Sequence, residues 1–421
     1  MLPGEVISID LTTGKILNKR FFINIKKELS LQHKNMNNIN EKEALDLLDF
    51  NLKKAVKRQT NLKNKNGIFL SGGIDSSILA KLIAENTNEK IYTYTLNDKT
   101  AGKNNADLAL SRVIAKQINS DHTEVEISPN IWFEEKEKTI SSFGQPFGHA
   151  YSTYFVSKEM KDDLKVAYSG DGSDEIFGNY LSHRFASSLD RYIHSKKINE
   201  TLLDQDQNKD KMFKKIMGKG KNWRYFLYNF TENKFKGFFD GFNQSNLLSD
   251  YNLSHTNNAI ADNFNQILIY EINNELPNQI LKFTDNLSMI NSIETRVPFL
   301  DNDLVNFAFS LPNSLKINHL TNKHYQTKYL LKLLSKRYLD NIFINRKPQG
   351  FQLNTNNWMR DFLKESIISV LNDKILYESF GINKKKCLKI AKDFFNNDNK
   401  YIYELWTLYI LGLWASIDKS N

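Results

Sequence analysis

The chain has 421 residues, of which 40% are hydrophobic and 25% charged, so it can bury one large core or two smaller ones. Its single cysteine, Cys387, excludes an internal disulfide bond and a cysteine-based zinc site. The formal net charge is +9, but no block of about five like charges occurs, so we expect no nucleic-acid partner. Without a signal-peptide pattern or an apolar run of about 18 residues, we expect a cytoplasmic protein with no membrane contact.

The first expected elements are a β-hairpin and a helix. EVISIDL alternates apolar and polar residues, TTGK is typical of a turn, and ILNKRFFINI resumes as a strand, so residues 1–27 predict a short hairpin. Residues 41–58 then show apolar positions at helical spacing, which are Ala44, Leu47, Leu48, Leu52 and Ala55.

From residue 66 the pattern alternates between strands and helices. Strands are predicted at 67–70, 91–96, 122–127 and 166–169, and helices over 77–86 and about 105–118. Such alternation is typical of an α/β fold with a parallel sheet and helices on both faces. The loops that follow the strands would then share one edge, where ligands bind. After about residue 181 the strand signals end, and the rest is predicted to be helices joined by loops.

The loop SGGIDSS, residues 71–77, follows a buried strand and opens a helix. Two glycines let a backbone approach phosphate oxygens, the serines offer hydroxyls, and a helix N-terminus carries partial positive charge. Asp75 would repel phosphate directly, but it could hold a Mg²⁺ ion that bridges to phosphate. The alternative is a simple turn in which Asp75 caps the helix.

A second loop, SGDGSDEIFGNY at 169–180, follows the fourth predicted strand. Asp171, Asp174 and Glu175 lie within five positions, and carboxylates packed so densely repel each other unless a cation compensates them. We expect that cation to be Mg²⁺ bound with ATP. The alternative is an exposed acidic turn.

These two loops resemble the paired ATP-site loops of the asparagine-synthetase C-terminal domain. IETRVPFLD at 293–301, NRKPQGF at 345–351 and a C-terminal stretch with Trp358, Trp406 and Trp414 are similar to that family as well, in the expected order. The resemblance covers about residues 40–421. It implies a five-stranded parallel ATP-pyrophosphatase sheet over about 60–185 and a mostly helical part over about 186–421.

The resemblance also implies a chemistry, in which ATP adenylates a carboxylate, pyrophosphate leaves, and an amine displaces AMP. Asp75 and Asp174 match the Mg²⁺ ligands, and Asp171 matches an acidic position, usually Glu, that could take a proton from the amine. The RVPFLD segment with Glu294 and Arg296 is interpreted as structural, with Asp301 capping the next helix. The positions that match ATP contacts are Leu70, Ser71, Gly72, Gly73, Asp75, Ser76, Ser77, Leu96, Ser169 and Gly170.

One motif departs from the family. The family has a catalytic lysine in the order R-x-K-x-G-F, whereas here Lys347 stands one place early and Pro348 takes the usual lysine position. Either the loop shifts and Lys347 serves, which the length of a lysine stem favours, or that charge is lost.

The family's full-length members begin with a glutaminase domain headed by a cysteine. This chain starts MLPGEV, so residues 1–30 are interpreted as the last hairpin of that domain and residues 41–421 as the synthetase domain. Three amine sources stay open: free ammonia or an amine substrate, a separate glutaminase chain, or the other half of a split gene.

The functional hypotheses follow from this. The first is a ligase that uses ATP and Mg²⁺ to make an amide, with aspartate as the default acid and a sugar acid, peptide or secondary metabolite as alternatives. The second is a nucleotide-binding half that needs a separate glutaminase partner. A homodimer is left open.

Overall fold

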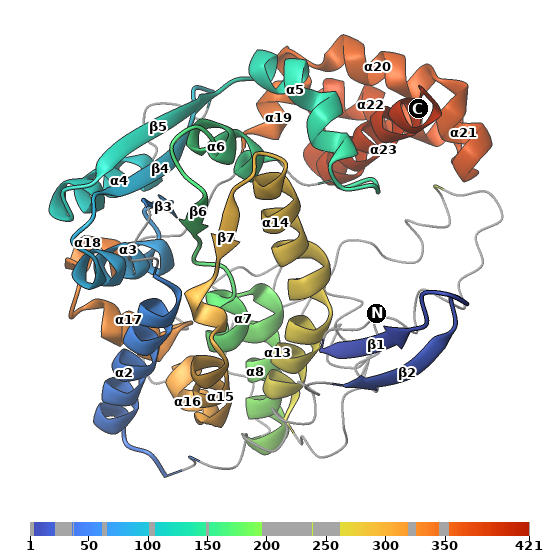
Figure 1. Ribbon diagram of the computed structural model, residues 1–421. Helices are drawn as coiled ribbons and strands as arrows, with labels where there is room; N and C mark the ends of the chain where they lie inside the picture. The colour runs from blue at the N-terminus through green and yellow to red at the C-terminus, as the bar shows by residue number, and fades with distance from the viewer. Residues whose placement is uncertain are drawn as a thin grey trace.

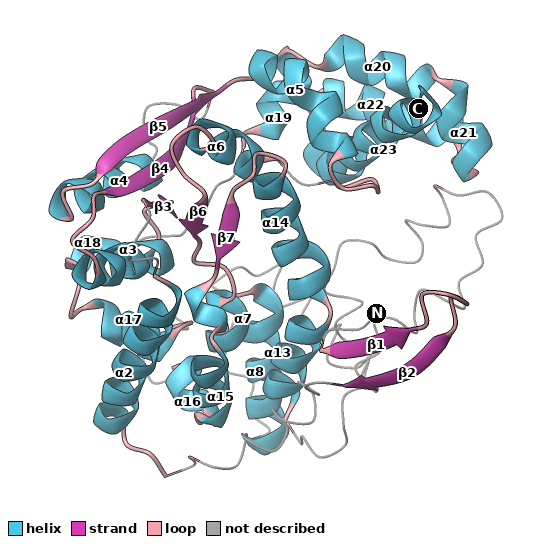
Figure 2. Cartoon of the chain, viewed as in Figure 1, coloured by secondary structure: helices cyan, strands magenta, loops and turns pink. Residues whose placement is uncertain are grey.

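The computed structural model describes residues 4–21, 36, 38–60, 65–100, 106–148, 151–195, 238, 262–318, 326–344 and 353–420. Figure 1 shows a central sheet with helices around it and a small hairpin set apart from the sheet, and Figure 2 shows how little of the second half is strand. The elements up to residue 195 are β1 (Glu5–Ile9), β2 (Ile16–Phe21), α2 (Glu41–Gln59), β3 (Asn66–Phe69), α3 (Ile74–Asn86), β4 (Ile91–Asp98), α4 (Ala106–Gln117), β5 (Asp121–Ile127), α5 (Pro129–Ser141), α6 (Ser152–Met160), β6 (Val166–Tyr168), α7 (Ser173–Phe177) and α8 (Leu181–Ser195).

The later elements are almost all helical. They are α13 (Asn263–Asn273), a π-helical turn (Leu276–Ile280), α14 (Leu281–Met289), β7 (Glu294–Arg296), a 3₁₀ turn (Pro298–Leu300), α15 (Asn302–Ser310), α16 (Asn313–Lys316), α17 (Tyr329–Ser335), α18 (Asn341–Ile344), α19 (Thr355–Asp361), α20 (Lys364–Asn372), α21 (Lys374–Phe380), α22 (Lys384–Phe395), a 3₁₀ turn (Asn399–Tyr401) and α23 (Ile402–Ser420).

The sheet has five strands in the order β5-β4-β3-β6-β7, and all neighbours are parallel. This confirms the predicted fold class and the four strands read from the alternation. The expectation that strand structure ends after residue 181 is wrong, because β7 pairs with β6 through Val166 and Glu294. β7 is a three-residue edge strand, Glu-Thr-Arg, so it carries no apolar alternation that the sequence could reveal.

Two hydrophobic clusters lie on opposite faces of the sheet, because successive strand residues point to opposite sides. Ile68, Val166 and Tyr168 join the cluster that contains side chains of α2, α3, α4, α8, α13, α15 and α17. Phe69 and Ala167 join the cluster with α5, α6, α14 and the C-terminal helices from α19 to α23. Helices therefore cover both faces, as expected (Figure 1).

The hairpin predicted over residues 1–27 is confirmed for residues 5–21, whereas residues 1–3 and 22–27 lie outside the described residues. β1 and β2 pair antiparallel as a hairpin. α2 begins after Asn40, whose side chain accepts from the Glu43 N–H while the Glu43 carboxylate accepts from the Asn40 N–H. Leu47, expected on the apolar face, is instead 37% exposed. Cys387, the single cysteine, is buried within α22. In the described part of the chain, no helix combines the length and apolarity needed to cross a membrane.

Candidate functional site

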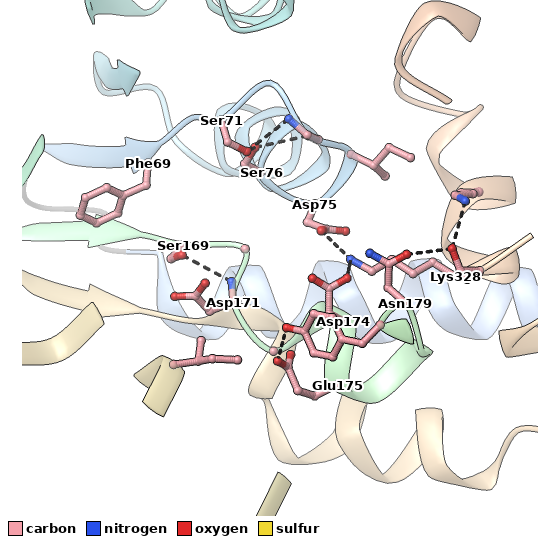
Figure 3. Close-up of a pocket in the computed structure, with 18 of the residues that line it drawn as sticks. Phe69, Ser71, Asp75, Ser76, Ser169, Asp171, Asp174, Glu175, Asn179 and Lys328 are labelled. Carbon is pink, nitrogen blue, oxygen red and sulfur yellow. Dashed lines mark hydrogen bonds and ion pairs between the residues drawn. The ribbon is translucent and has the colours of Figure 1, made fainter. Parts of the chain in front are cut away.

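A cavity of about 290 Å³ lies where β3 and β6 end, between the loops that follow them and the start of α17. Figure 3 shows side chains from both loops facing this space, with Lys328 opposite them. The two motifs recognised in the sequence therefore meet at one edge of the sheet. The residues that line the cavity are Phe69, Ser71, Gly73, Ile74, Asp75, Ser76, Ser169, Gly170, Asp171, Gly172, Asp174, Glu175, Asn179, Tyr180, Ile280, Thr327, Lys328, Lys332, Phe343 and Ile344.

Eight of the residues expected at the ATP, metal or catalytic site line this cavity. Others do not: Leu70, Gly72, Ser77 and Leu96 are buried behind its wall. Lys347 falls outside the described residues, although Ile344, three positions earlier, lines the cavity.

Glycines bring the two loops into contact. Gly72 has φ +69°, and a Cβ there would lie 2.3 Å from the carbonyl oxygen of Asp107, so α4 packs directly on the loop backbone. A Cβ on Gly170 would lie 3.0 Å from the Cβ of Asp75 and 3.2 Å from the backbone nitrogen of Ser76. Gly72 therefore lets α4 approach the first loop, and Gly170 lets the second loop pack tightly on the first.

The first loop is organised by its own serines. The hydroxyls of Ser71 and Ser76 lie 3.1 Å apart, and the Gly73 N–H donates to Ser71 Oγ at 3.3 Å. Asp75 does not cap α3, whose N-cap residue is Gly73, so the capping role expected in the simple-turn alternative is wrong. Its carboxylate instead accepts from the Ser173 hydroxyl of the second loop at 2.9 Å.

Lys328 joins the two aspartates. Its Nζ lies 2.6 Å from Asp75 Oδ2 and 2.5 Å from Asp174 Oδ1, and its side chain is only 6% exposed (Figure 3). Burial lowers the pKa of Lys328, but attraction to Asp174 and Asp75 outweighs burial and raises the pKa above its ordinary value. The alternative of an exposed acidic turn is wrong, because every residue of the second loop is buried or half-buried.

Asp75 and Asp174 are candidate ligands for a divalent cation, at the position where the Lys328 ammonium lies. Two carboxylates and one ammonium leave one negative charge, and the carboxylates already converge on a single positive group. Within the described residues, no cluster of three His, Cys, Asp or Glu could hold a metal by itself. Mg²⁺ is usually bound by one or two carboxylates together with waters and phosphate oxygens, so two aspartates are a sufficient protein donor set.

Two further carboxyl groups of the second loop also line the cavity. Asp171 Oδ2 accepts from the Thr284 hydroxyl of α14 at 2.7 Å, and burial raises the pKa of Asp171. Glu175 Oε1 accepts from the Tyr180 hydroxyl at 2.6 Å. Burial, followed by the charge of Asp174, raises the pKa of Glu175 to about 8.

Lys332 supplies a second cation, one helical turn after Lys328. Its Nζ lies 3.5 Å from the Thr327 hydroxyl, and no carboxylate of the described residues lies within ion-pair distance of it. Burial, followed by repulsion from Lys328, lowers the pKa of Lys332 to about 8. A lysine in this setting gains from an anionic ligand.

Lys328, Lys332 and Thr284 were not predicted from the sequence. TKYLLKLL, residues 327–334, does place two lysines four residues apart, but this spacing is common in a chain with 57 lysines and arginines.

Known proteins are similar to this chain over most of its length. The family model described as asparagine synthase matches residues 47–416. Asparagine synthetase (glutamine-hydrolyzing) 1 of Bacillus subtilis is 27% identical over 371 residues, which cover 84% of this chain and 56% of that protein. A putative asparagine synthetase (glutamine-hydrolyzing) of Mycobacterium tuberculosis is 23% identical over 398 residues, which cover 90% of this chain and 59% of that protein. The chain thus spans little more than half the length of these relatives.

Proposed function

This chain belongs to the asparagine synthase family, and on that premise we propose that it is an ATP-dependent ligase that adenylates a carboxylate and converts it to an amide, releasing AMP and pyrophosphate. Aspartate is the default acid, and ammonia or another amine is the nucleophile. The observation that carries the proposal is the cavity in which the two motif loops face Lys328 and Lys332.

The phosphates of ATP are proposed to lie along the first loop and the start of α3. Ser71 and Ser76 offer hydroxyls there, and the helix N-terminus offers N–H groups and partial positive charge. Lys332, which has no carboxylate partner among the described residues, would neutralise the departing pyrophosphate. Lys347 is proposed to act with it.

Mg²⁺ would be held by Asp75 and Asp174, and it would neutralise phosphate charge when bound. Lys328 lies between these carboxylates and links the two loops that carry them.

Asp171 is proposed to accept a proton from the attacking amine. The Thr284 hydroxyl fixes Oδ2 of this carboxylate, and Asp171 lines the cavity. The raised pKa of Asp171 makes its carboxylate a stronger base than an exposed aspartate.

The test is to incubate the purified chain with Mg²⁺, ATP, ammonium and a panel of acids headed by aspartate, and to measure pyrophosphate, AMP and the amide. We expect AMP and pyrophosphate in equal amounts. Their formation should depend on one acid of the panel, and turnover should be lost in Asp171→Asn. Release of ADP and phosphate, or ATP binding with no turnover on any acid in the panel, would exclude this activity.

A second candidate is a synthetase half that receives ammonia from a separate glutaminase chain. The relatives that suggest it are named as glutamine-hydrolyzing, and the matched residues cover 56% and 59% of them. Amide nitrogen from ¹⁵N-ammonium and from amide-labelled glutamine should be compared, with and without an added glutaminase. Incorporation from glutamine by this chain alone would exclude the candidate.

A further inference from the structure

A buried histidine lies directly behind the cavity wall. His183, in the first turn of α8, has a fully buried side chain, and Glu271 of α13, its partner, is 1% exposed. His183 Nε2 lies 2.5 Å from Glu271 Oε2, and the Ser182 hydroxyl donates to Glu271 Oε1 at 2.9 Å. None of these three side chains lines the cavity.

The other ring nitrogen contacts the chain that follows the second loop. His183 Nδ1 accepts the backbone N–H groups of Asn179 at 3.0 Å and Tyr180 at 3.2 Å. Two donors directed at Nδ1 require a lone pair there, so the ring proton is assigned to Nε2 and is donated to Glu271. A carboxylate on one side thus fixes the tautomer that the backbone requires on the other.

The turn held in this way touches two separate parts of the cavity wall. The Gly178 carbonyl accepts from the Lys328 N–H at 3.2 Å, and Asn179 Oδ1 accepts from the Thr327 hydroxyl at 2.8 Å. The Tyr180 hydroxyl donates to Glu175 at 2.6 Å. Residues 178–180 therefore connect the acidic loop to the segment that carries Lys328.

We propose that His183, oriented by Glu271, is a positioning residue that fixes the turn of residues 178–180 and thereby sets the positions of Lys328 and Glu175 in the cavity. The inference rests on the proposed function, since Lys328 pairs with Asp75 and Asp174, the two carboxylates proposed to hold Mg²⁺. His183 would act through the geometry of the site. Displacing the groups of an active site by about 1 Å can lower the reaction rate about a hundredfold.

The test compares two variants of His183 with a matched control. His183→Phe keeps a ring but removes the acceptor, whereas His183→Asn keeps an oxygen close to the position of Nδ1. The control is Asp190→Asn, because Asp190 also links α8 to α13, accepting from the Asn263 and Phe264 N–H groups at 2.8 and 2.9 Å, but does not touch the turn.

The readouts are amide hydrogen exchange at Asn179 and Tyr180, the Kd for Mg²⁺–ATP, kcat and KM, and the melting temperature. In His183→Phe we expect exchange at both amides to accelerate, and kcat/KM to fall by about tenfold or more. His183→Asn should restore most of the slow exchange at the two amides and most of kcat/KM. Asp190→Asn should lower the melting temperature without changing the amide exchange at residues 179 and 180 or kcat/KM.

Some results would overturn the inference. If His183→Phe and Asp190→Asn lose similar thermal stability and show the same exchange at residues 179–180 and the same Kd for ATP, His183 is merely structural. If the unmodified chain binds no ATP, the proposed function fails, but the exchange rates of the two amides still decide whether His183 holds the turn.

Discussion

Replacing Lys328 with methionine tests the electrostatic account of the cavity most directly. Methionine keeps the length and apolar stem of lysine but removes the ammonium that lies 2.6 Å from Asp75 and 2.5 Å from Asp174. Two carboxylates on adjacent loops would then face each other without a counter-charge.

The magnitude follows from burial. Removing one partner of a fully buried ion pair costs about 3–5 kcal/mol. Lys328 is 6% exposed, but Asp75 and Asp174 are 25% and 29% exposed, so water screens the remaining carboxylates in part. We therefore expect a loss near the lower end of that range, about 3 kcal/mol in the free energy of unfolding.

The assay is unfolding in urea and by heat, each with EDTA and with excess Mg²⁺. Mg²⁺ should stabilise Lys328→Met more than the unmodified protein, because no ammonium competes for the carboxylates; at a hundredfold excess over Kd the gain is about 2.7 kcal/mol. The control is Lys336→Met, an exposed lysine just beyond α17. Equal effects of the two substitutions, or equal stabilisation by Mg²⁺ in variant and unmodified protein, would refute the reasoning.

Three more predictions concern neighbouring residues. Lys332→Met should weaken inhibition by added pyrophosphate by about tenfold, whereas Lys332→Arg should retain it; unchanged inhibition in Lys332→Met would refute the phosphate role. Gly72→Ala should destabilise the fold by about 2–4 kcal/mol, because the new Cβ, on a residue with left-handed backbone, would meet the Asp107 carbonyl. An unchanged melting temperature in thermal unfolding would contradict the close approach of α4 to this loop. Because burial raises the pKa of Glu175 to about 8, the native state holds a proton there that the unfolded state has lost, so its contribution to stability is present at low pH and declines between about pH 4.5 and 8. Unfolding measured across that window should show a shallower decline in Glu175→Gln, and identical slopes would argue against a raised pKa.

Local patterns in the sequence were enough for much of the fold. The structure confirms four predicted strands and the helix at 41–58, which depend on hydrophobic period and burial. It also confirms the cap at Asp301, whose side chain accepts from the N–H two residues later. The two loops were recognisable because their glycines, serines and aspartates follow buried strands within a few positions. β7 was not, because an edge strand of three polar residues has no periodic signal.

The sequence by itself thus determined which loops carry the acidic and hydroxyl groups, and that parallel strands would bring them to one edge. Only the tertiary structure decided what compensates their charge. Lys328 pairs with Asp75 across 253 positions of chain, and His183 meets Glu271 across 88. Such partners are selected by how helices pack against the sheet, and no short-range pattern distinguishes these side chains from the many other charged residues of the chain.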